Sequence, residues 1–248
     1  MENVKEVIKD KYGKIANASA PTSCCSATSC CDSLQFNVVM AEQYSKEQIG
    51  EMEIANLNLG CGTPTEYADI SEGMTVLDLG SGAGIDVFIA SQYVGESGNV
   101  IGLDMTEEML ARANENARKL NISNVEFRFG EIEHMPVDDN AIDRIISNCV
   151  LNLVPEKEKA FSEMYRVLKT GGAFIVSDIV TEGNFPEHLQ RGAELWAGCV
   201  AGAMNKNDYL SLFKNVGFQH VEILKEKKYG EVSTNDYALL SITVKGVK

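Results

Sequence analysis

The stretch Val76-Leu77-Asp78-Leu79-Gly80-Ser81-Gly82-Ala83-Gly84 decides the fold of this chain. Its first half is an apolar run of the kind that forms a buried strand in a parallel sheet. Its second half has glycine at every other position, and glycine lets the backbone turn sharply and approach a ligand closely. A helix from Ile85 to Tyr93 follows, with its free amide groups directed at that turn. The stretch therefore predicts a strand, a ligand-binding turn and a helix.

Strands and helices alternate along the chain beyond this stretch. Further strands are expected at 99–103, 125–129, 141–147 and 173–177, and helices at 4–12, 42–53, 106–120, 157–168 and 207–215. This alternation predicts an α/β fold, a Rossmann-like, doubly wound and mostly parallel sheet with helices on both faces. The final strands, 221–224 and 237–244, are expected to form an antiparallel hairpin at its edge. A helix at 186–200 interrupts the alternation, and we interpret it as an inserted segment that caps the substrate pocket.

The composition excludes several classes of partner. The 248 residues include 22 basic and 36 acidic ones, for a net charge of −14. Such a surface repels a polyanion, so we expect no nucleic-acid partner. No apolar run approaches the roughly 18 residues of a membrane span, and the N-terminus is too charged for a secretory signal. We therefore expect a cytoplasmic protein that does not bind membranes.

The residues around the glycines indicate which ligand the turn holds. The dinucleotide-binding pattern Gly-x-Gly-x-x-Gly is not met, because Ile85 stands at its last position. Asp78, before the first glycine, suits a cofactor that carries an ammonium group. Asp104, at the end of the second strand, is placed to accept hydrogen bonds from ribose hydroxyls. Glu131 follows the third strand and suits an adenine amino group, and Asn148 follows the fourth and suits an amino acid portion. The alternative is a set of ordinary turn glycines and exposed acids.

Four motifs of the chain resemble those of the class I methyltransferases. They are 76–84, Gly102-Leu103-Asp104, Gly130-Glu131 and Arg166-Val167-Leu168-Lys169-Thr170-Gly171-Gly172. The resemblance implies S-adenosylmethionine as cofactor. The residues it assigns to the cofactor are Asp78, Gly80, Ser81, Gly82, Gly84, Asp104, Met105, Glu131, Ile132 and Asn148. We expect a cofactor-binding core at 61–180, preceded at 1–60 by a helix, a Cys-rich mobile segment and a lead-in helix. Residues 181–248 would supply the capping helix and the final strands.

Three cysteines lie where a substrate would bind in such a fold. Cys61 precedes the first strand in a glycine turn, Cys149 directly follows the fourth strand, and Cys199 ends the inserted helix. The chain has seven cysteines, and in a reducing compartment metal or thiolate chemistry is favoured over disulfides. Thiolates select soft, thiophilic ions. The alternative for each cysteine alone is a small buried apolar side chain.

The segments around these cysteines resemble the arsenite methyltransferases. They are Leu57-Asn58-Leu59-Gly60-Cys61-Gly62-Thr63-Pro64, Ser147-Asn148-Cys149-Val150-Leu151-Asn152-Leu153 and Trp196-Ala197-Gly198-Cys199-Val200-Ala201-Gly202-Ala203. The resemblance implies that the thiols matching Cys149 and Cys199 hold As(III), free or already thiol-bound. It implies that the thiol matching Cys61 assists and undergoes disulfide exchange. Thioredoxin or glutathione is then the reductant.

The N-terminal segment departs from the family pattern. Many members have a single cysteine in this region, whereas this chain has Cys24-Cys25 and Cys30-Cys31. Cys30 or Cys31 lies closer to Cys61 in sequence, which makes these two the candidates for the redox role. The pairs could instead collect As(III) or bind zinc, or belong to a tail without a defined role. Two other functions stay open: a methyltransferase for a small organic acceptor such as a quinone, and a non-catalytic protein that binds As(III) or zinc.

Overall fold

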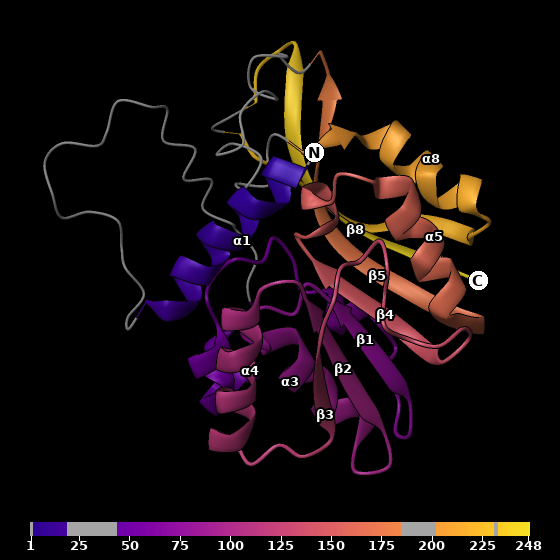
Figure 1. Cartoon of the computed structure of the whole chain (residues 1–248). Helices are drawn as coiled ribbons and strands as arrows, with labels where there is room; N and C mark the ends of the chain where they lie inside the picture. The colour runs from indigo at the N-terminus through magenta and orange to yellow at the C-terminus, as the bar shows by residue number, and fades with distance from the viewer. Residues whose placement is uncertain (1, 19–43, 185–201, 231–232) are drawn as a thin grey trace, which may run out of the picture.

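The structure, a computed structural model, describes residues 2–18, 44–184, 202–230 and 233–248. Their centre is a twisted sheet in the order β3-β2-β1-β4-β5-β8-β7, with the short β6 beside β5 (Figure 1). The strands are β1 (Thr75–Leu79), β2 (Asn99–Asp104), β3 (Val125–Phe129), β4 (Ile142–Asn148), β5 (Leu168–Gly183), β6 (Met204–Asn205), β7 (Gln219–Lys228) and β8 (Tyr237–Val247). Strands β1 to β5 pair in parallel, and β8 pairs antiparallel with both β5 and β7. The predicted fold class is confirmed, including the antiparallel pair at the edge.

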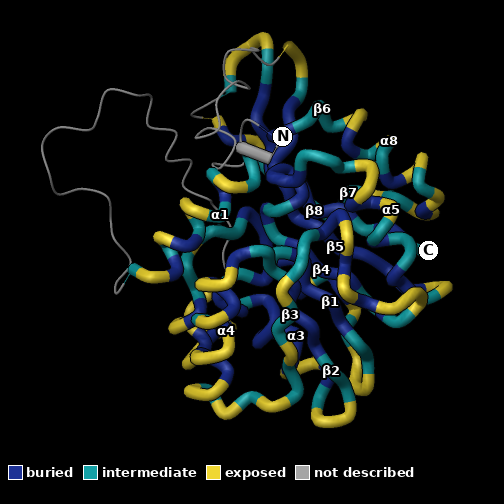
Figure 2. The backbone as a smooth tube through the Cα atoms, viewed as in Figure 1, coloured by how far each residue is buried: buried dark blue, intermediate teal, exposed yellow. Residues whose placement is uncertain are grey.

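Helices cover both faces of the sheet because alternate strand residues point to opposite sides. The α-helices are α1 (Glu2–Asn17), α2 (Lys46–Ile49), α3 (Ile85–Val94), α4 (Glu107–Lys119), α5 (Lys157–Val167) and α8 (Lys206–Val216), and short 3-10 helices span Gly50–Ala55, Pro64–Tyr67 and Leu151–Leu153. Along β1, Val76 packs with α3 on one face, whereas Leu77 packs with α5 and α8 on the other. The inner strands are accordingly mostly buried, whereas the edge strands β3 and β7 are partly exposed. Exposed residues also gather on the outer sides of the helices and at the turns (Figure 2).

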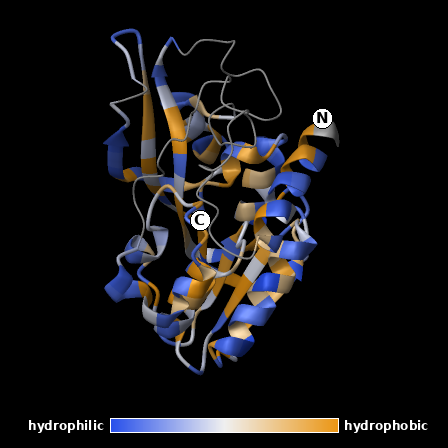
Figure 3. Cartoon of the chain, turned by 90° about the vertical axis from the view of Figure 1, so that its left-hand side faces the viewer, coloured by the Kyte–Doolittle hydropathy of each residue, from blue (hydrophilic) through white to orange (hydrophobic). Residues whose placement is uncertain are grey.

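The helix α1 stands apart from this layered arrangement. It crosses the carboxyl end of the sheet beside α4, as Figure 1 shows. Hydrophilic and hydrophobic residues alternate along it, so that it has one apolar side (Figure 3). Ile8 on that side is buried against Cys149, Leu153 and neighbouring apolar residues. The helix therefore lies over the sheet edge at which the predicted ligand-binding turn is found.

Two predicted elements differ from the structure in extent. The strand expected at 173–177 begins earlier, at Leu168, directly after α5. Gly171 and Gly172 are hydrogen-bonded to Lys248 within the sheet, so they do not form a loop between the helix and the strand. The helix expected at 42–53 is divided at Gly50 into α2 and a 3-10 helix. The capping helix expected at 186–200 and most of the Cys-rich segment lie outside the described residues. No helix in the described part of the chain is long and apolar enough to cross a membrane.

Candidate active site

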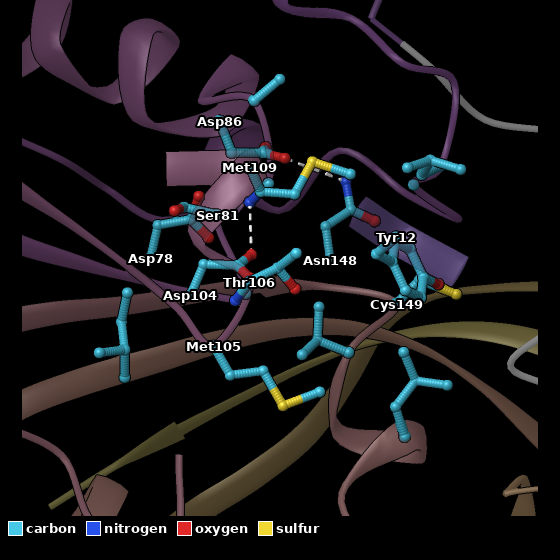
Figure 4. Close-up of a pocket in the computed structure, with 18 of the residues that line it drawn as sticks. Tyr12, Asp78, Ser81, Asp86, Asp104, Met105, Thr106, Met109, Asn148 and Cys149 are labelled. Atoms are coloured by element: carbon cyan, nitrogen blue, oxygen red, sulfur yellow. Dashed lines mark hydrogen bonds between the residues drawn. The ribbon is translucent and has the colours of Figure 1, made fainter. Parts of the chain in front are cut away.

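A pocket opens at the carboxyl edge of the sheet, where the strand order reverses between β1 and β4. Ligands of open α/β sheets bind at such a position. The pocket is partly open to solvent and is lined by residues from the amino-terminal helix, the glycine turn and the ends of β2 and β4. Figure 4 shows Asp78, Asp86, Asp104 and Asn148 around this space, each from a different element.

The glycine turn forms the floor of the pocket. Gly80, Gly82 and Gly84 have φ values of 68°, 52° and 98°, in the left-handed region that glycine adopts without strain. The amides of Gly80 and Ser81 donate to the carbonyl of Leu103 at 2.8 and 3.0 Å, which ties the turn to β2. A Cβ on Gly80 would lie 2.6 Å from the side chain of Val150, so the turn also fits closely under the segment after β4.

The Asp104 carboxylate connects the glycine turn to the start of α4. Its Oδ2 accepts from the amide of Gly82 at 2.9 Å, and its Oδ1 accepts from the amide of Thr106 at 2.8 Å. Burial raises the pKa of Asp104, and these backbone hydrogen bonds oppose that shift. The group is thus fixed in position at the pocket wall, as the end of the second strand predicts.

Two further carboxylates face the same space. Asp78 is 2% exposed, and burial, followed by the charges of Asp86 and Asp104, raises its pKa well above the usual range. Burial also raises the pKa of Asp86 to about 6, although Tyr44 and Asn148 donate hydrogen bonds to it. The like charges of the buried Asp78 and Asp86 and the half-buried Asp104 favour a positively charged ligand in this pocket.

These features fit S-adenosylmethionine. Its ammonium and sulfonium groups would offset the carboxylates, and its ribose hydroxyls would find acceptors at Asp104. The hydroxyl of Ser81 is buried at the pocket and has no hydrogen-bond partner within the described residues. Buried polar groups normally have a partner, and a bound ligand would supply one here.

The N-terminal helix covers one side of the pocket through Lys5, Ile8 and Tyr12. Lys5 Nζ lies 2.7 Å from Glu131 Oε2 and 2.9 Å from Glu133 Oε1. Glu133 is 4% exposed and lines the pocket, whereas Glu131 is paired with Lys5 outside the lining residues. The acid nearest the cavity after β3 is therefore Glu133, two residues beyond the one that the sequence indicates.

Cys61 and Cys149 bond to the same carbonyl group, the first through its thiol and the second through its backbone amide. Cys61 Sγ donates to the oxygen of Ser177 at 3.5 Å, and the amide of Cys149 donates to the same oxygen at 2.7 Å. Both cysteines are buried, within an apolar cluster that includes Ile8, Leu153 and Ile179. Cys149 has a φ of 62°, which is uncommon for a side chain other than Asn, Asp or Gly and is often found at functional sites.

The structure brings most of the predicted site residues together. The pocket is lined by Asp78, Gly80, Ser81, Gly82, Asp104, Met105, Ile132, Asn148 and Cys149. Gly84 begins α3 behind the turn, where a Cβ would lie 2.8 Å from Phe88. Cys61 lies between Gly60 and Gly62, which line the pocket, and directs its thiol at Ser177. Cys30, Cys31 and Cys199 are outside the described residues.

Several residues that line the pocket are not identified by the sequence alone, among them Asp86, Glu133, Lys5, Tyr12 and Tyr44. Asp86 carried a usable signal, since it is an acid in the first turn of a helix that begins at a ligand-binding glycine turn. Within the described part of the chain, no group of three or more Cys, His, Asp or Glu side chains is arranged to hold a metal ion.

Comparisons with known proteins agree on the class of enzyme. A methyltransferase-domain family model matches residues 70–217. The arsenite methyltransferase of Halobacterium salinarum is 41% identical over 232 residues, which are 90% of this chain and 59% of that protein. The crystal structure of an arsenic(III) S-adenosylmethionine methyltransferase from Chlamydomonas reinhardtii matches with a TM-score of 0.70 and 36% identity, over 76% of this chain and 67% of that one.

A second group of relatives is similar over a shorter stretch. The ubiquinone/menaquinone biosynthesis C-methyltransferase of Citrobacter koseri is 43% identical over 112 residues, or 45% of each chain. The arsenite methyltransferases, in contrast, align with 85% to 94% of this chain. The chain itself spans only 58% to 66% of the length of the curated arsenite methyltransferases that it matches.

Proposed function

This chain belongs to the arsenite methyltransferase family, and from that premise we propose that it transfers a methyl group from S-adenosylmethionine to trivalent arsenic held by its own cysteine thiolates, in arsenic detoxification. The observation that supports the proposal is that Cys61 and Cys149 are buried in one cluster and bond to the same carbonyl of Ser177, through a thiol and a backbone amide respectively, beside the pocket that contains Asp78, Asp86 and Asp104. This arrangement puts soft ligands for arsenic next to acceptors for a cationic methyl donor.

The carboxylates orient the cofactor in this proposal. Asp78 and Asp86 bind its ammonium group, and Asp104 accepts from the ribose hydroxyls. Met105, Ile132 and the pair Glu131–Glu133 surround the adenine, with Lys5 holding the two glutamates in place. When bound, S-adenosylmethionine supplies an electrophilic methyl group, which the arsenic lone pair takes as an As–C bond forms and the C–S bond breaks.

The thiols position the arsenic for this step. Cys149 and Cys199 are its ligands, with Cys61 assisting, so that the lone pair is directed at the methyl group. Holding two reactants in line can supply roughly 7–11 kcal/mol of rate enhancement. Trivalent arsenic has no proton to lose, so no general base is required. The apolar surroundings of Cys61 and Cys149 support the proposal because they keep water away from the reacting atoms.

The thiols also restore the arsenic for another cycle. Methyl transfer formally oxidises arsenic, and two protein thiols return the electrons by forming a disulfide, which an external thiol then reduces. Cys61 with Cys30 or Cys31 is the proposed pair, and thioredoxin or glutathione the proposed reductant. A need for reduced thiols supports a cytoplasmic location.

The test is to incubate the purified protein with labelled S-adenosylmethionine, As(III) and a thiol reductant, and to separate the arsenic species. We expect labelled methylarsenicals from the wild-type chain and none from Cys149→Ser or Cys199→Ser, with S-adenosylhomocysteine binding unchanged in both variants. Ser162→Ala is the control, since Ser162 is exposed on α5 and bonds only within that helix. Wild-type turnover in either cysteine variant contradicts the thiolate model.

The second candidate is methylation of a small organic acceptor. It is favoured by the 43% identity to a quinone methyltransferase, but that similarity extends over only 45% of this chain. A quinone reaction would not depend on Cys149 or Cys199, so the same two variants separate the candidates. Binding of As(III) or zinc without any methylated product would indicate the non-catalytic alternative.

A further inference from the structure

The carboxamide of Asn148 connects the cofactor pocket to the Cys61 turn. Its Oδ1 accepts from the amides of Cys61 and Gly62 at 2.9 and 3.2 Å. Its Nδ2 donates to the carbonyl of Gly62 at 2.8 Å and to Asp86 Oδ2 at 3.2 Å, the bond drawn in Figure 4. A carboxamide has two donor hydrogens and two acceptor lone pairs. All four positions are used within the protein, so Asn148 has no hydrogen-bonding capacity left for a ligand.

The Cys61 turn is shaped to receive this carboxamide. A Cβ at Gly60 would lie 2.6 Å from Asn148 Nδ2, and a Cβ at Gly62 would lie 2.4 Å from Ser177 Oγ. Ser241 Oγ in turn donates to the carbonyl of Cys61 at 2.7 Å. The turn lies between two 3-10 helices and outside the regular strands. Side chains from β4 and β8, and a close fit against β5, therefore set the place of Cys61.

The other end of the connection is Asp86, which lines the cofactor pocket. Its Oδ1 accepts from the hydroxyl of Tyr44, and its Oδ2 accepts from Asn148. A cationic ligand beside Asp86 stabilises the ionised carboxylate, and an ionised acceptor forms a stronger hydrogen bond than a neutral one. A cationic ligand in the pocket thus strengthens the hydrogen bond that Asn148 donates to Asp86. Because Asn148 also bonds to the amides of Cys61 and Gly62, the ligand and the Cys61 turn are connected through its carboxamide.

We propose that Asn148 is a positioning residue that couples occupation of the cofactor pocket to the placement of the Cys61 thiol. The part that Cys61 takes in arsenic chemistry rests on the proposed function, whereas the coupling rests on the hydrogen bonds alone. Coupling between two sites is reciprocal, so the thiol turn would also favour the bound cofactor. The consequence is that Cys61 is held firmly against Ser177 and Cys149 when the methyl donor is present.

The test measures how fast N-ethylmaleimide alkylates Cys61 in the full chain at pH 5, by peptide mass spectrometry, with and without saturating S-adenosylhomocysteine. At this pH Asp86 of the free protein is largely protonated, because its pKa is about 6. Cys61 is 0% exposed, so its alkylation requires the turn to open. In the wild type we expect the ligand to slow alkylation about tenfold, in line with one strengthened hydrogen bond to a charged group. Asn148→Asp keeps the acceptor oxygen and loses both donor hydrogens. In this variant we expect Cys61 to be alkylated faster in the absence of ligand, and the ligand to change the alkylation rate by less than about twofold.

Three further variants make the result specific. Asn124→Asp is the matched control, because Asn124 Nδ2 also donates to two carbonyls, those of Ser91 and Gly95, away from the thiols. It should keep the wild-type response. Gly60→Ala displaces the Asn148 carboxamide without adding a charge and should lose the response, whereas Gly230→Ala, with nothing within 4 Å of the new Cβ, should keep it.

If the ligand slows alkylation of Cys61 in both Asn148→Asp and Gly60→Ala as much as in the wild type, the ligand merely shields Cys61. That result overturns the coupling. Loss of ligand binding in both variants also overturns it, because Asn148 would then support the cofactor site itself. If Asn148→Asp does not fold, Gly60→Ala decides. The measurement contains no arsenic, so a chain that fails to methylate arsenite still gives an answer on the coupling.

Discussion

At the scale of single residues, the ionisation of Asp86 should determine how tightly the pocket binds its cofactor. Burial raises the pKa of Asp86 to about 6, in a space shared with Tyr44, Asn148 and the equally buried Asp78. A bound ammonium group requires the carboxylate. Below pH 6 the free protein holds a proton that it must release on binding, so affinity is full above pH 6 and falls as the pH is lowered through it.

We therefore expect the dissociation constant of S-adenosylhomocysteine to rise about tenfold from pH 7 to pH 5. Titration calorimetry in buffers of different ionisation enthalpy would count the released proton. Asp86→Asn should bind more weakly at pH 7 and show a flatter pH profile. An affinity that is constant across this range in the wild type would remove Asp86 from the ammonium site.

Asp104 offers a second prediction at this scale. Asp104→Ala removes the acceptor for the amides of Gly82 and Thr106 as well as the proposed ribose contact. Loss of hydrogen bonds to a charged group costs about 1.5–3 kcal/mol, so we expect roughly 10- to 100-fold weaker binding of S-adenosylhomocysteine by calorimetry. Asp139→Ala is the control, because Asp139 is exposed, pairs with Arg166 and does not line the pocket. Unchanged affinity in Asp104→Ala would exclude the ribose role.

The sequence predicts the place of a site residue where that place follows from the strand that carries the residue. Asp104 ends β2, and the parallel neighbours of β2 bring that end to the pocket. Glu131 lies in a short turn after β3 that is closed by a bridge between Glu131 and His134. Because of this turn, Glu133 lines the cavity and Glu131 does not. The partners of Asn148 were not predictable either, because they come from residues 62 and 87 positions away in the sequence.

At the scale of elements, α1 should hold the cofactor in place as a cover. Its carboxyl end is fixed by Arg112 Nη1, which donates to the carbonyl of Ala16 at 2.9 Å. Its other half is fixed by Lys5 at Glu131 and Glu133. The sequence predicted a helix here but not its docking site, since the Arg112 bond joins residues 96 positions apart. Helical periodicity identifies the apolar side of a helix, and only the folded sheet defines what that side contacts.

Lys5→Met tests this cover. It leaves the buried Glu133 without its cation, which we expect to destabilise the docked helix by about 1.5–3 kcal/mol and to speed dissociation of S-adenosylhomocysteine. Lys14→Met is the matched control on the same helix, because Lys14 is 75% exposed and pairs with Asp10 of that helix. Stopped-flow displacement of the ligand gives the rates. Equal rates in the two variants would mean that α1 does not retain the cofactor.

At the scale of the whole molecule, the net charge of −14 should influence which form of arsenic reaches the thiols in the proposed reaction. Arsenite is neutral near pH 7, whereas its glutathione complex carries carboxylates. An anionic complex approaches an acidic protein against a repulsive field, and salt screens that field because the Debye length falls from about 30 Å at 0.01 M to about 10 Å at 0.1 M.

The initial rate at low arsenic concentration should therefore rise with ionic strength when arsenic is presented as the glutathione complex. It should stay nearly flat when arsenic is presented as a complex with a neutral thiol such as 2-mercaptoethanol. Measuring both at equal arsenic and S-adenosylmethionine concentrations from 0.01 to 0.1 M salt cancels any effect of salt on cofactor binding. A rate that falls with salt for the glutathione complex would mean that basic side chains near the entrance outweigh the overall charge. In that case the acidic surface would serve solubility and not the selection of the arsenic complex.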